Sequence, residues 1–198
     1  MIAAIVPAGG ASERMGVPKA LLSYRGRTFL RAILDACAAL GVKERIVVLG
    51  YDADKILSES DLNDVAVLRT PSPESGPIGS IRAGIEAVLN RPVEGVLVWH
   101  VDRPHVAMAT VEALLDRFRR GKEPIVVPSH HGRRGHPVIF GRAVFEELLA
   151  VPDDQGARAV VRSDPSRVAV VPVDDSAVTE DIDTPEAYKD LLRREDTR

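Results

Sequence analysis

Short apolar runs rich in β-branched residues alternate with helical patterns along most of this chain. The runs occupy residues 2–6, 45–49, 65–68, 93–99, 124–128 and 168–173. The spacing of apolar residues and the capping signals predict helices at about 29–40, 53–58, 80–89, 107–119, 142–150, 155–162 and 184–193. Because this alternation is typical of βαβ units, we expect an α/β fold with a mostly parallel sheet. Ligands of such sheets bind beyond the carboxyl ends of the strands.

The size of the chain predicts one domain. Its 198 residues, 45% of them hydrophobic, are enough to bury a sizeable core. No internal repeat or long linker divides them. The single cysteine, Cys37, excludes an intramolecular disulfide, and its helical spacing from Ile33 and Leu40 predicts a core residue rather than a nucleophile.

The charge balance limits the kinds of partner that we expect. There are 26 basic and 29 acidic residues, a formal net charge of −3, which disfavours a nucleic acid or a membrane surface as the main partner. The first apolar run is too short for a signal peptide, and no stretch is long enough to span a membrane. We therefore expect a cytoplasmic protein.

A glycine-rich stretch at residues 7–19 follows the first apolar run directly. Gly9 and Gly10 leave room for a close approach of phosphates, and Arg14 and Lys19 supply positive charge. The spacing fits neither a Walker A loop nor the dinucleotide motif G-x-G-x-x-G. A plain surface loop with solvated cations is the alternative, which the position after a strand disfavours. The stretch predicts a loop that binds a polyanion.

The pattern A-G-G-x-S-x-R-M-G-x-P-K in this stretch resembles the signature of the nucleotidyltransferases that share the fold of the molybdenum-cofactor guanylyl- and cytidylyltransferases. The resemblance implies a Rossmann-like, three-layer αβα nucleotidyltransferase fold in which this loop wraps a nucleoside triphosphate. It also implies base and ribose contacts from a second segment, where we expect Ser80 to cap a helix. The implied nucleotide contacts are Ala8, Gly9, Gly10, Ser12, Arg14, Lys19, Gly79 and Ser80.

Two acidic residues are the predicted metal ligands. Asp102 ends an apolar run, so its carboxylate should emerge at the edge of the sheet, and carboxylates suit Mg²⁺. The family carries a metal-binding Asp at this position, and an Asn or Asp at the position of Asp183. The alternatives are a turn before Pro104 and an acidic helix start at residue 183. The resemblance implies one Mg²⁺ held by both acids, with Arg14, Lys19 and Asp102 as catalytic residues.

Residues around Asp102 depart from the family pattern or suggest other metals. Arg103 stands where the family usually has Gln or Met before the proline, so its role is open. His100 lies two residues before Asp102 and shares its strand face. Together with His105 it could suggest a transition-metal site, but a structural hydrogen bond is the favoured interpretation.

A second motif concerns the acceptor. G-x-x-G-H-P at residues 132–137, followed by an apolar run and by D-Q-G-A-R at 154–158, resembles the cytidylyltransferase branch that acts on molybdopterin. This implies that residues 1–128 form the nucleotide-binding core and 129–198 an acceptor-side elaboration. Exposed turn arginines and a histidine that braces the turn are the alternatives. The implied acceptor contacts are Arg133, Arg134, His136 and Arg158.

The resemblance implies Mg²⁺-dependent transfer of CMP from CTP to a molybdopterin-type cofactor, with release of pyrophosphate. A molybdoenzyme is a candidate partner. GTP as donor, or a sugar or polyol phosphate as acceptor, remains open. A non-catalytic carrier of the molybdenum cofactor is the alternative from another class. A phosphomonoester acceptor is largely dianionic at neutral pH, so the reaction needs no protein nucleophile or general base.

Overall fold

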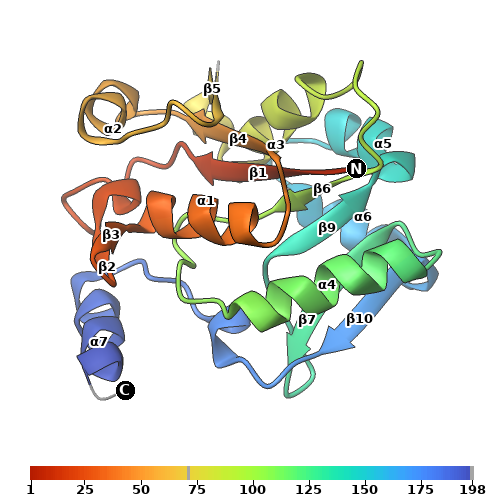
Figure 1. Ribbon diagram of the computed structural model, residues 1–198. Coiled ribbons are helices and arrows are strands. Elements are labelled where there is room, and N and C mark those ends of the chain that lie inside the picture. Colours follow the sequence, from red (N-terminus) through yellow and green to blue (C-terminus); the bar gives the residue numbers. More distant parts are fainter. Residues whose placement is uncertain (71, 197–198) are drawn as a thin grey trace.

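A twisted sheet with helices on both faces forms the computed structural model, which describes residues 1–70 and 72–196 (Figure 1). The order of its strands is β10-β7-β9-β6-β1-β4-β5, with β8 paired to β7. The strands are β1 (Ile2–Ala8), β4 (Glu44–Leu49), β5 (Ala66–Arg69), β6 (Gly95–Val98), β7 (Ile125–His130), β8 (Arg133–Arg134), β9 (Val138–Gly141) and β10 (Val168–Pro172). A separate hairpin comprises β2 (Ser23–Tyr24) and β3 (Arg27–Thr28).

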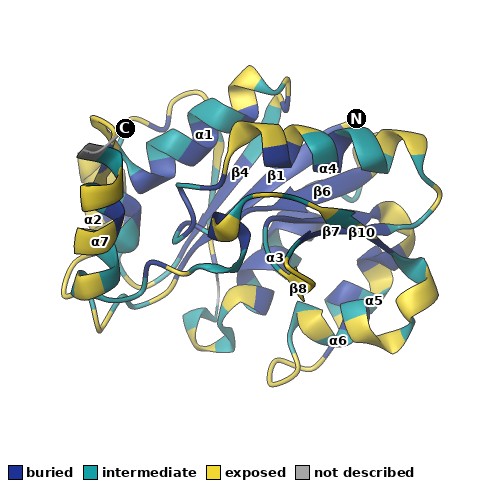
Figure 2. Ribbon diagram, turned by 90° about the horizontal axis from the view of Figure 1, so that it is seen from below, coloured by how far each residue is buried: buried dark blue, intermediate teal, exposed yellow. Residues whose placement is uncertain are grey.

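The helices form two layers, as the alternation of patterns predicted. They are α1 (Phe29–Ala39), α2 (Ala53–Glu59), α3 (Pro77–Glu86), α4 (Met108–Arg120), α5 (Phe145–Ala150), α6 (Ala157–Ser163) and α7 (Pro185–Asp196). Buried residues of α1, α2 and α4 share one core, and those of α3, α5 and α6 share the other. In Figure 2 the buried sheet lies between exposed outer helix faces. The three-layer α/β fold is confirmed.

Strand β1 contributes to both cores because its side chains alternate between the two faces of the sheet. Ala4 and Val6 belong to the core beneath α1 and α4, whereas Ala3 and Ile5 belong to the core beneath α3. A fully apolar strand is what a parallel sheet covered on both faces requires. Cys37 is also completely buried, as expected from its spacing.

Strand β9 is antiparallel to both of its neighbours, β6 and β7, whereas the pairs β6–β1, β1–β4, β4–β5 and β7–β10 are parallel. The chain reverses after β7 through a two-residue turn at His131 and Gly132, which both have positive φ (47° and 79°). Such turns match the twist of antiparallel strands. The mostly parallel sheet is confirmed, with β9 inserted in the opposite direction.

Several predicted boundaries differ in the structure by a few residues, and two of them bear on the site. Strand β1 continues to Ala8, two residues beyond the prediction. Helix α3 begins at Pro77, so the prediction that Ser80 caps it is wrong. Gly76 occupies the cap position with φ 66°, and a proline in the first turn suits a helix start because its missing N–H is not needed there.

The last helix begins as predicted. The Thr184 hydroxyl accepts a hydrogen bond from the Ala187 N–H at 3.2 Å, and Pro185 is the first residue of α7. This cap matters because Asp183 immediately precedes it. Within residues 1–70 and 72–196, no helix combines the length and apolar character needed to cross a bilayer.

Candidate active site

The glycine-rich loop is organised by Ser12. Its carbonyl accepts the backbone N–H groups of Met15 and Gly16 at 2.9 and 3.1 Å, and its hydroxyl accepts the N–H of Lys19 at 3.2 Å. The backbone of Ser12 has φ 50°, the left-handed region that short polar residues tolerate. These bonds close the loop into a turn and direct Lys19 towards the carboxyl edge of the sheet.

Gly9 rests directly on Gly50, at the end of strand β4. A Cβ atom on Gly50 would lie 2.3 Å from the carbonyl oxygen of Gly9 and 2.7 Å from its Cα. The N–H of Tyr51 donates to the same carbonyl at 3.4 Å. The glycine-rich loop can therefore keep this path only if residue 50 has no side chain. Sequence reasoning did not predict this contact.

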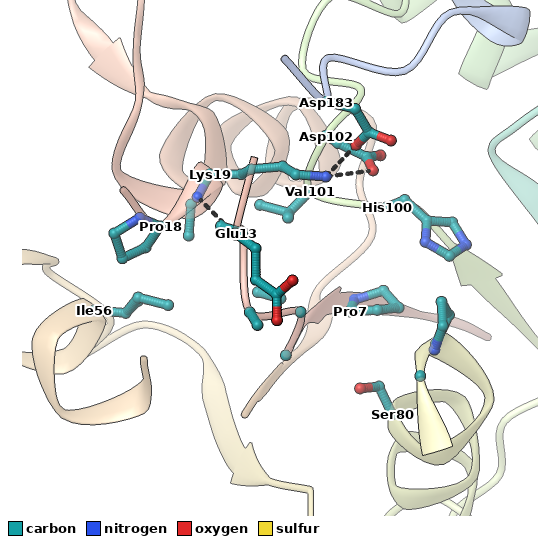
Figure 3. Close-up of a pocket in the computed structure, with 18 of the residues that line it drawn as sticks. Pro7, Glu13, Pro18, Lys19, Ile56, Ser80, His100, Val101, Asp102 and Asp183 are labelled. Atoms are coloured by element: carbon teal, nitrogen blue, oxygen red, sulfur yellow. Dashed lines mark hydrogen bonds and ion pairs between the residues drawn. The ribbon is translucent and has the colours of Figure 1, made fainter. Parts of the chain in front are cut away.

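The ammonium of Lys19 points at both predicted metal ligands (Figure 3). Its Nζ is 3.3 Å from an Asp102 carboxylate oxygen and forms a short ion pair with Asp183. Arg14 reaches the other oxygen of Asp183 at 2.7 Å. Burial raises the pKa of Asp183, but Lys19 and Arg14 outweigh it and hold that pKa below its ordinary value. The structure thus brings together four predicted residues from three distant parts of the chain.

The donor set at this point fits a divalent cation with oxygen ligands. The second carboxylate oxygen of Asp102 is buried and has no hydrogen-bond partner among the described residues. A buried acceptor without a partner is unfavourable, and a metal ion would satisfy it. Two carboxylates, completed by phosphate oxygens and water, suit Mg²⁺ or Mn²⁺.

A cavity of about 460 Å³ lies between the glycine-rich loop and the start of α3. The predicted nucleotide contacts on the glycine-rich loop all line it, and so does Ser80. Gly79 does not line it; a Cβ on Gly79 would face Ser75 and the Ser72 carbonyl instead. Residues that sequence reasoning did not assign also line this cavity: Pro7, Ala11, Glu13, Pro18, Ala20, Ile56, Gly76, Pro77, His100 and Val101.

A second cavity, of about 590 Å³, adjoins the first, and both include His100 and Pro77 in their walls. The four predicted acceptor residues all line it: Arg133, Arg134, His136 and Arg158. Arg103 and Arg162, which were not predicted as acceptor contacts, also line it and add two further cations. Its apolar part is formed by Ile78, Ile81, Val98, Val127, Val138, Phe140 and Val161. The cavity therefore combines an apolar wall with several guanidinium groups.

His100, which lines both cavities, contacts His136, which lines the second. Their rings meet edge to face, with centroids 4.6 Å apart. Burial, together with the nearby His100, Arg103 and Arg158, lowers the pKa of His136 to about 2. Burial likewise lowers the pKa of His100. Both rings are therefore neutral at physiological pH and can serve as hydrogen-bonding groups rather than cations.

An α/β sheet that presents a cation-flanked glycine loop and paired carboxylates at one edge is the architecture of a nucleotide-binding transferase. Residues 4–171 match the family model of the MobA-like NTP transferase domain. The chain belongs to this family and is a nucleotidyltransferase. The family resemblance expected from the glycine-rich motif is thus confirmed.

Several known proteins resemble the chain over most of its length. Nicotine blue oxidoreductase from Paenarthrobacter nicotinovorans is 31% identical, with 96% of each chain covered. A probable molybdenum cofactor guanylyltransferase from Bacillus anthracis is 28% identical over 77% of this chain and 74% of that protein. The bifunctional protein GlmU of Sinorhizobium medicae is 28% identical over 78% of this chain, which spans only 34% of GlmU.

A solved structure is similar to the entire fold. Rv0371c from Mycobacterium tuberculosis is 31% identical and superposes with a TM-score of 0.84, with 98% of each chain covered. A second structure of that protein, with a TM-score of 0.78 and 30% identity over 97% of this chain and 98% of that chain, is a complex with manganese. A relative with this fold thus binds a divalent metal.

Proposed function

We propose that this protein transfers CMP from CTP to a molybdopterin-type cofactor and releases pyrophosphate. The observation that carries the proposal is the meeting of Asp102, Asp183 and Lys19 beside the glycine-rich loop, next to a separate arginine-lined cavity. The first cavity would hold the nucleotide, and the second would hold the acceptor. Residues 129–198 supply most of the charged groups of the acceptor side.

The residues present can perform this transfer mainly by positioning and charge stabilisation. The glycine-rich loop would orient the triphosphate, and Arg14 would neutralise charge on its leaving portion. Lys19 would hold the reacting phosphate near the acceptor. Asp102 and Asp183 would bind Mg²⁺, which supplies charge neutralisation when bound. A phosphate monoester on the acceptor is already nucleophilic at neutral pH, so the neutral His100 and His136 need not remove a proton.

The acceptor cavity supports a compact ring system with a phosphate. Its apolar wall suits a flat heterocycle, while guanidinium groups bind phosphate through two parallel hydrogen bonds. Arg133 and Arg134 lie on the exposed β7–β8 hairpin, and Arg158 lies in the first turn of α6; all three line this cavity. A similarity to a probable guanylyltransferase makes GTP the first competing donor, and a sugar or polyol phosphate is the competing acceptor.

A second candidate activity is reduction of a planar heteroaromatic compound. The observation in its favour is the 31% identity, over nearly the whole chain, to a protein named as an oxidoreductase. In this case the glycine-rich loop would hold the pyrophosphate of a nicotinamide dinucleotide, and the second cavity would hold the compound to be reduced. Transfer requires the paired carboxylates, whereas reduction has no evident use for them.

One set of assays separates these possibilities. The protein is incubated with each of the four nucleoside triphosphates, a molybdopterin source and Mg²⁺ or Mn²⁺, and both pyrophosphate and the mass of the product are measured. We expect pyrophosphate and a cytidine dinucleotide product only with CTP. Product from GTP alone would replace the donor, and product with a sugar phosphate would replace the acceptor. Oxidation of NADPH or NADH with a quinone-type dye, without pyrophosphate from any nucleotide, would overturn the proposed cytidylyl transfer.

A further inference from the structure

Arg103 is a buried cation that directly follows Asp102. Its side chain is 9% exposed and forms a short ion pair with Asp181. The same guanidinium donates a short hydrogen bond to the carbonyl of Val178, and a longer one, of 3.5 Å, to that of Ala177. All of these acceptors lie on the segment 177–183, which ends in the predicted metal ligand Asp183.

The backbone of Arg103 is itself held in place. The indole N–H of Trp99, which is completely buried, donates to the carbonyl of Arg103 at 2.9 Å. The N–H of Arg103 donates to the carbonyl of His100 at 3.1 Å. Both the N–H and the carbonyl of Arg103 are therefore hydrogen-bonded within the segment that follows strand β6.

The carbonyl of Val178 joins three parts of the site. It accepts the guanidinium of Arg103 and also the backbone N–H of His136, at 2.8 Å. A Cβ atom on Gly135 would lie 2.0 Å from the same oxygen, so the acceptor-side loop passes directly over it. Through this carbonyl, Arg103 links the loop after β6, which carries Asp102, to the segment that carries Asp183 and to the loop that carries His136.

We propose that Arg103 is a positioning residue that holds the segment 177–183 so that the Asp183 carboxylate faces Asp102 across Lys19. This inference rests on the proposed function, because it assigns a role in building the metal site of that reaction. Arginine suits the role because its planar fork donates to a carboxylate and to backbone carbonyls at once, which a lysine ammonium cannot do in a fixed geometry.

A purely structural ion pair explains less of the geometry. The Asp181 side chain is 49% exposed, whereas that of Arg103 is only 9% exposed. Neutralisation of a buried acid therefore does not explain why Arg103 is buried. The guanidinium is instead drawn into the protein towards backbone carbonyls of one segment. A residue that orients a metal ligand without touching the metal typically changes metal affinity about 10- to 100-fold when it is lost.

The test compares Arg103→Met and Arg103→Lys with a matched control, Arg167→Met. Arg167 is also a partly buried arginine, paired with Glu147 at 2.5 and 2.9 Å, and it lines neither cavity. Three quantities are measured: Mn²⁺ affinity from the paramagnetic resonance of the free ion, the Mn²⁺ concentration that half-activates transfer, and the KM for CTP. Hydrogen exchange of the peptide spanning 177–184 reports on the segment itself.

We expect Arg103→Met to weaken Mn²⁺ binding and raise the half-activating concentration by about tenfold or more. The KM for CTP at saturating Mn²⁺ should change less than twofold, and the 177–184 peptide should exchange faster. Arg103→Lys should recover part of the affinity, and Arg167→Met should match the wild type. If Arg103→Met does not fold, the pair Arg103→Lys and Asp181→Asn carries the test, with weaker Mn²⁺ binding expected in both.

Unchanged Mn²⁺ affinity in folded Arg103 variants would overturn the proposal, and so would a wild-type protein that binds no Mn²⁺. Failure of the proposed function would appear differently. In that case no nucleotide would yield pyrophosphate with the wild type, but Arg103→Met would still bind Mn²⁺ more weakly than the wild type. The positioning role of Arg103 would then stand without the proposed reaction.

Discussion

The backbone N–H of Ile182 donates to the carbonyl of Asp102 at 3.1 Å. This bond fixes the chain immediately before Asp183 to the residue that carries the other predicted metal ligand. Because the bond involves only backbone atoms, side-chain substitutions at Asp102 and Asp183 should leave it in place. The two acids can therefore be altered with little effect on the path of the chain.

Replacement of either acid should strongly reduce the rate of transfer while the protein stays folded. We expect Asp102→Asn and Asp183→Asn each to lower kcat by about 10²-fold or more, because each removes a charge that the metal ion needs. Pyrophosphate release measures the loss, and circular dichroism checks the fold. Asp116→Asn, on the exposed face of α4, is the control and should retain full activity. Nearly normal turnover in both site variants would contradict the metal assignment.

Lys19 should compete with a metal ion for the two carboxylates. Its ammonium forms ion pairs with both acids, so its removal leaves two neighbouring carboxylates with only Arg14 beside them. We expect Lys19→Met to bind Mn²⁺ several-fold more tightly than the wild type in the absence of nucleotide, yet to have a much lower kcat. Equilibrium dialysis with Mn²⁺ and a pyrophosphate assay provide the two measurements. Weaker metal binding in the variant would show that Lys19 does not occupy this position in solution.

Gly50→Ala and Gly84→Ala should separate a functional contact from a packing contact. The added methyl at position 50 meets backbone atoms of Gly9, whereas at position 84 it meets side-chain carbons of Ile5 at 2.7–2.8 Å. Both changes should destabilise the protein by about 1–3 kcal/mol, as overpacking does. Only Gly50→Ala displaces the glycine-rich loop, so only this variant should raise the KM for the nucleotide, by about tenfold. Urea unfolding and steady-state kinetics together provide the comparison.

The buried His136 should make stability fall in acid. Its pKa is about 2 in the folded protein against an ordinary value of 6.5, so below pH 6.5 the unfolded chain binds a proton that the folded protein does not. Its favourable contribution is complete above pH 6.5 and is lost as the pH falls towards 2, by at most about 1.4 kcal/mol per pH unit. The groups that lower the pKa are His100, Arg103 and Arg158, besides burial itself.

His136→Asn removes this proton and tests the prediction. Between pH 6 and pH 5, the free energy of unfolding should fall less steeply with decreasing pH in the variant than in the wild type. The difference between the two slopes should correspond to about one bound proton. Urea unfolding curves at several pH values measure both slopes. Equal slopes would mean that His136 is protonated in the folded protein.

Local patterns in the sequence were enough to predict much of this protein. The apolar runs and helical spacings predicted the layers, because burial on both faces of a parallel sheet imposes a residue pattern that can be read locally. The glycine-rich stretch indicated the nucleotide loop, since glycines and cations after a first strand have few other uses. Asp102 was expected at the edge of the sheet because it directly follows an apolar run.

Tertiary structure alone decided how distant parts meet. The insertion of β9 between β6 and β7, the seating of Gly9 on Gly50, and the pairing of Arg103 with the segment before Asp183 have no signature in neighbouring residues. Each depends on contacts between residues far apart in the chain. The order in which the strands assemble into the sheet decides which of these residues meet, and local conformational preference does not. The residue types of the site could therefore be predicted from the sequence, but the contacts that hold their side chains in place could not.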